Sequence, residues 1–207
     1  MRSSFVACAV ASASVVSIFV APQSSAGMVA VSSRFVWDYY VGAAGLSTAT
    51  EGFGGVADGT TAGPVSGSVS GITWTVSSAG GILADAGVLS AAAPVTLTFT
   101  FSPGVYAVAG NFFGLDAGRS PVPVLFAATL ADGTAYSGIA ADPSSLVGFV
   151  STAPGQSISS LSVTVTNLAG AGSVFAAADN IYLGVVPAPG AIALLAAAGL
   201  VGSRKSR

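Results

Sequence analysis

The sequence predicts an all-β fold, an antiparallel β-sandwich or jelly roll, because apolar and polar residues alternate along several short runs. Over 95–101 one valine, one leucine and two phenylalanines share one face, and three threonines share the other. Stretches rich in glycine and serine separate such runs at the spacing typical of antiparallel sheets. No long amphipathic helical pattern interrupts them. The 207 residues therefore hold one ordinary domain with a further segment on each side.

Each expected strand alternates in this way or forms a short, mostly apolar run. The candidate strands are 35–41, 72–76, 95–101, 105–113, 124–130, 135–139, 147–150, 161–165 and 174–183. Between two of them, Asp132 and Gly133 predict a type I′ hairpin turn. The glycine- and serine-rich stretches 52–70, 77–87 and 153–157 are expected to be loops.

The composition excludes several classes of function. The chain has no histidine, which removes the Ser-His-Asp triad and an imidazole base. Between 28 and 184 the only basic residues are Arg34 and Arg119, whereas all eight acidic residues of the chain lie there. This acidic balance argues against nucleic acid as a partner. With neither histidine nor lysine to activate a serine nucleophile, the central domain is not expected to be an enzyme.

The first 26 residues have the pattern of a secretory signal peptide, expected to be helical. Arg2 supplies the positive start, 5–20 is uncharged and mostly apolar, and Ser24, Ser25 and Ala26 supply small residues for cleavage. Removal of 1–26 also removes Cys8, the only cysteine, so no disulfide is expected in the remaining chain. The alternative is an uncleaved N-terminal membrane anchor.

The C-terminal segment 185–207 has three parts in a fixed order. A proline motif, Val186-Pro187-Ala188-Pro189-Gly190, comes first, and the apolar stretch 191–201 follows. The basic residues Arg204, Lys205 and Arg207 come last. As a helix the apolar part would span only about 20 Å at 1.5 Å per residue, short of the ~30 Å hydrocarbon core. These features favour a processed sorting signal over the alternative, a plain single-span anchor.

This order resembles the PEP-CTERM sorting signal of Gram-negative bacteria, although Ala188 stands where that family usually has glutamate. The resemblance implies export through the secretion machinery and signal peptidase, with transient insertion into the inner membrane. It further implies processing by an exosortase-type membrane protease and delivery to the cell surface or extracellular matrix. The expected organisation is therefore a signal peptide at 1–26, a β-sandwich ectodomain at 27–184 and a sorting signal at 185–207.

The central domain has its own resemblance. The motifs at 50–53, 110–114, 130–134, 147–151 and 179–182 occur in an order similar to that of β-sandwich domains carried by PEP-CTERM proteins. Those domains resemble carbohydrate-binding jelly rolls, in which the first and last strands often lie side by side. Under this resemblance Glu51, Asp179 and Asn180 are candidate ligands of a structural Ca²⁺, which binds hard oxygen donors. The alternative is that Asp179 caps a turn and Glu51 is solvated.

Two other groups of residues are candidate ligand contacts. Trp37, Tyr39 and Tyr40 are candidates for stacking on a sugar, because aromatic rings pack on the apolar faces of pyranoses. The alternative is that they fill the core. Arg119 is expected to form a local surface ion pair with Asp116.

The threonine-bearing faces of the strands carry little charge, and exposed strands of this kind pair with neighbouring chains. The expected function is therefore that of a structural or interaction protein of the cell surface or matrix. The alternative is a carbohydrate-binding module that is stabilised by Ca²⁺ and contacts extracellular polysaccharide.

Overall fold

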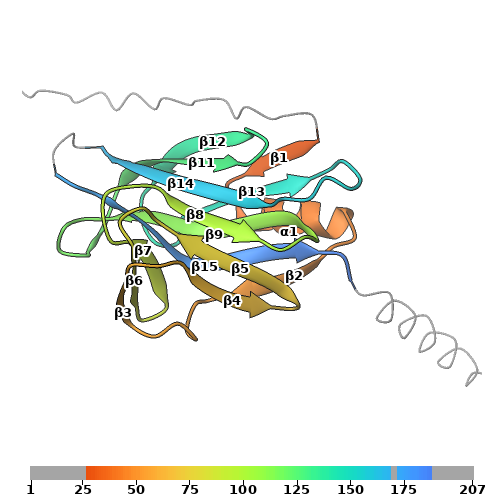
Figure 1. Cartoon of the computed structure of the whole chain (residues 1–207). Helices are drawn as coiled ribbons and strands as arrows, with labels where there is room; N and C mark the ends of the chain where they lie inside the picture. The colour runs from red at the N-terminus through yellow and green to blue at the C-terminus, as the bar shows by residue number, and fades with distance from the viewer. Residues whose placement is uncertain (1–26, 169–171, 188–207) are drawn as a thin grey trace, which may run out of the picture.

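The computed structural model describes residues 27–168 and 172–187, which form two antiparallel sheets with one helix on the outside (Figure 1). The expected all-β sandwich is thus confirmed. The proposed signal segment 1–26 and the tail from Ala188 onward, including Pro189, Gly190, Arg204, Lys205 and Arg207, lie outside the described residues.

The first sheet has nine strands. In spatial order its main path is β1 (Met28–Val31), β13 (Leu146–Ser151), β9 (Val105–Leu115), β15 (Phe175–Val185), β7 (Val88–Ala91), β6 (Ile82–Asp85) and β3 (Gly59–Thr61), with β2 (Ser47–Glu51) paired to β15 and β10 (Pro121–Val122) paired to β9. The long strands β9 and β15 are neighbours at its centre and carry most of its pairing.

The second sheet has six strands. In spatial order these are β12 (Ala135–Ala140), β11 (Val124–Leu130), β14 (Ser160–Asn167), β8 (Leu97–Phe101), β5 (Ile72–Ser77) and β4 (Val65–Val69). Alternate residues of its central strands are buried, as in β5, where Ile72, Trp74 and Val76 point inward. The period of two that predicted these strands therefore also places their apolar faces in the core.

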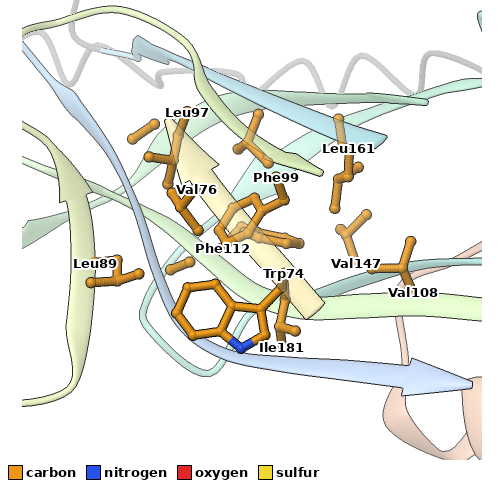
Figure 2. Packing of buried hydrophobic residues seen from close by; sticks show 14 of the residues in the cluster. Trp74, Val76, Leu89, Leu97, Phe99, Val108, Phe112, Val147, Leu161 and Ile181 are labelled. Carbon is orange, nitrogen blue, oxygen red and sulfur yellow. The ribbon is translucent and has the colours of Figure 1, made fainter. Parts of the chain in front are cut away.

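The inner faces of the two sheets form one hydrophobic core. Figure 2 shows Trp74 and Phe99 of the six-stranded sheet close to Phe112 and Ile181 of the nine-stranded sheet. Phe99 lies edge-on to Phe112 at 5.9 Å between ring centroids, and Phe53 contacts Trp74 edge-on at 5.3 Å. Such aromatic pairs add about 0.5–1.5 kcal/mol each to the burial of their surface.

One expected strand, 35–41, is wrong: this run lies in helix α1 (Arg34–Ala43). A mostly apolar run of seven residues is too short to distinguish the period of a strand from the period of a helix. The helix is favoured because Trp37 and Val41, which are four residues apart, lie on the same side of a helix. Both side chains then pack on the outer face of the nine-stranded sheet. The other eight expected strands are present.

Two expected loops, 52–70 and 77–87, are also wrong in part, because they contain β3, β4 and β6. Gly67 shows why such glycine-rich strands are overlooked. It lies opposite Trp74 in the β4–β5 pair, and a Cβ atom there would collide with the indole ring. The glycine makes room for a large side chain within a sheet and does not mark a turn.

The hairpin at Asp132 is confirmed, but its turn type differs from the expected one. Only Gly133 has a positive φ, of 87°, whereas a type I′ turn requires two such residues. The Leu130 N–H donates to the Thr134 carbonyl, which closes a three-residue loop. Asp132 accepts a bond from the Thr134 N–H at 2.8 Å, which favours this loop over the tighter turn.

Candidate functional site

The structure places Glu51 beside the strand of Asp179 and Asn180, as expected, because β2 pairs with β15 and Glu51 lies opposite Ile181. Both carboxylate oxygens of Glu51 already accept hydrogen bonds. The indole N–H of Trp74 donates to Oε2 at 2.9 Å, and the Phe53 N–H donates to Oε1 at 2.8 Å. Glu51 thus joins the two sheets and holds Phe53 in its left-handed conformation, at φ 55°.

Asp179 and Asn180 lie in the irregular part of β15, where the register with β9 shifts between Ala178 and Ile181. A bulge of this kind re-aims side chains. Asp179 lines a pocket on the outer face of the sheet, whereas the Asn180 side chain lies beside Gly52. In residues 27–168 and 172–187, no group of three or more His, Cys, Asp or Glu side chains is placed to hold a metal ion.

Trp37, Tyr39 and Tyr40 do not form one platform. The Trp37 side chain is fully buried under α1 and lies 6.1 Å from the ring of Tyr182. Tyr39 points away from the sheet and is 66% exposed. Tyr40 is half-buried and touches Tyr39 edge-on at 5.5 Å. A ligand on this helix would therefore contact Tyr39 and the edge of Tyr40, but not Trp37.

Beyond α1, the outer face of the nine-stranded sheet forms a concave site that we call the outer-face pocket. Its volume is about 240 Å³. Phe113, Leu115 and Val88 supply apolar walls, and Asp85 and Asp179 lie at its border. Among the described residues neither carboxylate has a hydrogen-bond partner. Two carboxylates without such a partner therefore line a pocket with apolar walls.

Arg119 completes the outer-face pocket, and its expected ion pair with Asp116 is wrong. Its Nη1 donates to the Ser90 hydroxyl at 3.3 Å and to the Ala91 carbonyl at 3.1 Å. Its guanidinium carbon lies 4.1 Å from the centre of the Phe175 ring. Asp116 accepts from the Ser120 N–H instead, which shapes the turn that carries the side chain toward β7.

The backbone of Arg119 is itself unusual, with φ at 64°. A residue other than glycine is rarely left-handed, and such strain is concentrated at functional positions. The hydrogen bonds to Ser90 and Ala91 use two of the five guanidinium N–H donors. Arg119 is thus held in place while it presents a positive charge to the outer-face pocket.

A neighbouring turn borders the outer-face pocket through Pro143. Asp142 begins this turn, because its carbonyl accepts from the Ser145 N–H at 3.1 Å. The Ser144 hydroxyl donates to the Asp142 carboxylate at 2.6 Å, and this bond lowers the pKa of that carboxyl. Asp142 is therefore a charged, turn-forming residue at neutral pH.

The outer face of the six-stranded sheet is a second notable surface, which we call the hydroxyl face. None of the six strands contains Asp, Glu, Lys or Arg. The residues that define the face are Ser66, Ser68, Thr73, Thr75, Thr98, Thr100, Ser162, Thr164 and Thr166.

Some hydroxyls on this face bond across strands, such as Ser66 with Thr75 at 2.9 Å and Thr98 with Ser162 at 3.2 Å. The edge strands β12 and β4 lack the lysines with which proteins usually discourage strand pairing.

A scan against protein-family models found no match, and searches of curated proteins and of solved structures found none either. None of the helices in 27–168 and 172–187 is both long enough and apolar enough to cross a membrane.

Proposed function

We propose that this chain is an exported structural or interaction protein of the cell surface or extracellular matrix, delivered by its C-terminal sorting segment. The observation that carries the proposal is the hydroxyl face. A charge-free sheet face with two uncharged edges presents no electrostatic barrier to a second copy. A surface of this kind suits a component that must assemble or adhere outside the cell.

The sequence at each end of the domain supports the export part of the proposal. The sandwich begins with β1 at Met28 and its last strand ends at Val185. The residues before it have the pattern of a signal peptide, and those after it carry the proline motif, apolar stretch and basic end. Signal peptidase, the secretion machinery and an exosortase-type protease are the proposed partners.

The proposal is tested by placing charge on the hydroxyl face. Thr100 and Thr164 are exposed on two of its central strands. In the double variant Thr100→Lys/Thr164→Lys, self-association is expected to fall at least about tenfold, because facing ammonium groups repel one another. Sedimentation velocity over a range of concentrations measures this change.

The matched control is Thr48→Lys/Thr50→Lys on β2 of the other sheet, where both threonines are also exposed. It adds the same charge, and its association is expected to stay at the wild-type level. A wild-type chain that remains monomeric, or equal association in both variants, would contradict the role of the hydroxyl face.

The outer-face pocket favours a second candidate function, the binding of a neutral carbohydrate. Apolar walls suit the ring face of a pyranose, while Asp85 and Asp179 are free to accept bonds from its hydroxyls and Arg119 to donate one. The proposed relationship to carbohydrate-binding jelly rolls is compatible with a sugar site in the outer-face pocket. A sugar cannot stack on Trp37, because that side chain is buried.

Calorimetric titration with a panel of neutral oligosaccharides tests this second function. For any sugar that binds, Asp179→Asn is expected to weaken affinity at least about tenfold, the scale of one hydrogen bond to a charged group. Asp38→Asn, on α1 and away from the outer-face pocket, is the control. If Asp179→Asn leaves the affinity unchanged, the sugar does not bind in this pocket.

A further inference from the structure

The start of β1, at Met28, and the end of β15, at Val185, lie at the same end of the sandwich. Met28 of β1 pairs with Ser151 of β13. Val150, which precedes Ser151 in β13, pairs with Ala107 of β9. Ala107 in turn pairs with Gly184, near the end of β15. The first and last residues of the domain are thus separated by only two intervening strands, about 14 Å at the usual strand spacing.

Helix α1 lies at this same end. The C-terminal half of α1 and Val186 line one hollow of about 500 Å³, together with Tyr106 and the loop after β13. Figure 1 shows α1 beside the point where β15, in blue, ends. The chain therefore enters its C-terminal segment next to the helix.

The outward side of α1 is apolar. Phe35 is 81% exposed and Tyr39 66% exposed, and Val36 is also exposed. The only charges on the helix, Arg34 and Asp38, pair with each other at 2.9 Å. Exposed aromatic residues on one helix face are unusual in a soluble protein and mark an interaction surface.

We propose that this face of α1 rests on the surface of the lipid bilayer while the C-terminal segment is inserted. The argument is the length of chain beyond the domain. Only four residue steps separate Pro187 from Ala191, the first residue of the apolar stretch, which is at most about 14 Å of extended chain. A tether this short holds one end of the domain near the bilayer, and that end carries α1.

The residue types agree with this contact. Phenylalanine and tyrosine are favoured at the boundary between lipid and water, and the paired charges of α1 leave it without net charge. The contact thus needs no anionic lipid. The inference depends on the proposed sorting segment and adds what the domain itself does during the anchored stage.

A fluorescent probe on α1 tests the proposal in the full chain. Gly42 lies on the same outward side as Phe35, and a Cβ atom there would meet nothing within 4 Å. In a chain with Cys8→Ser, the substitution Gly42→Cys provides one labelling site for an environment-sensitive fluorophore. Gly63→Cys, in the loop between β3 and β4, is the control site, because Gly63 is exposed and a Cβ atom there would also meet nothing within 4 Å.

Flotation with neutral phosphatidylcholine vesicles first reports whether the chain binds membrane at all. In the floated fraction, the Gly42 probe is expected to shift to the blue and brighten, whereas the Gly63 probe is expected to keep its lipid-free spectrum. Adding Phe35→Ser and Tyr39→Ser is expected to reduce the shift at Gly42 while flotation persists.

Each other outcome overturns the inference in a distinguishable way. If the chain floats but the Gly42 probe is unchanged, the helix does not touch lipid and the sorting segment is unaffected. If the chain does not float, the proposed membrane insertion fails and this contact fails with it. A shift at Gly42 that follows protein concentration without lipid would assign the face to a second copy.

Discussion

Glu51→Ala is expected to lower the free energy of unfolding by about 2–4 kcal/mol, measured by chemical denaturation. The substitution removes the acceptor of two hydrogen bonds, from the Trp74 indole and from the Phe53 N–H. Trp74 is 2% exposed and Phe53 1% exposed, so neither donor gains full access to water in exchange. Phe53 also loses the bond that holds its left-handed backbone.

Two further variants separate the parts of this effect. Trp74→Phe removes one donor and keeps an aromatic ring, so it is expected to cost about 1–3 kcal/mol. Glu51→Gln keeps an acceptor oxygen and is expected to be the mildest of the three. If Glu51→Ala is as stable as the wild type, the link between the sheets through Glu51 contributes nothing.

The same variants test the proposed calcium site. With both oxygens of Glu51 engaged within the protein, addition of Ca²⁺ is expected to leave the wild-type unfolding midpoint unchanged relative to chelator. A rise in Tm with Ca²⁺ that disappears in Glu51→Gln would assign Glu51 to a metal site and contradict its purely structural role.

Gly148→Val is expected to lower the free energy of unfolding by about 2–4 kcal/mol, because it separates α1 from the sheet. A Cβ atom at Gly148 would lie 2.7 Å from Cδ1 of Trp37 and 2.6 Å from the Cβ of Ala109. Trp37 cannot move aside without exposing its buried ring. The effect is measured by chemical denaturation together with the near-ultraviolet circular dichroism of the two buried tryptophans, Trp37 and Trp74.

A double-mutant cycle identifies the cause. Trp37→Leu makes space above Gly148, so the cost of Gly148→Val is expected to be partly relieved in that background. Gly42→Ala, on the exposed side of α1, is the control and is expected to be neutral or slightly stabilising. If the cost of Gly148→Val is the same in both backgrounds, contact with Trp37 is not its source.

The fold was predictable where the sheets are regular. In β5, β8 and β11 the apolar residues alternate because one face of each strand covers the core, so the period of two appears directly in the sequence. Helix α1 was not predictable in this way. Its type depends on the sheet face that it covers, and a run of seven residues fits both periods.

The candidate sites were less predictable than the fold. Glu51 and β15 were expected to be neighbours, but nothing in the sequence pairs Glu51 with the indole of Trp74. The outer-face pocket brings together Asp85, Arg119 and Asp179 from three distant parts of the chain. No spacing marks them as a group. The left-handed backbone of Arg119 and the bulge at Asp179 are visible only in the folded chain.

The most direct test of the central proposal is the distribution of the full chain between cell fractions. The host is a Gram-negative bacterium with an exosortase-type protease, and the comparison is a chain truncated after Pro187. The full chain is expected in the surface or matrix fraction, and the truncated chain is expected to stay soluble in the periplasm. Equal distribution of the two chains would contradict sorting by the C-terminal segment.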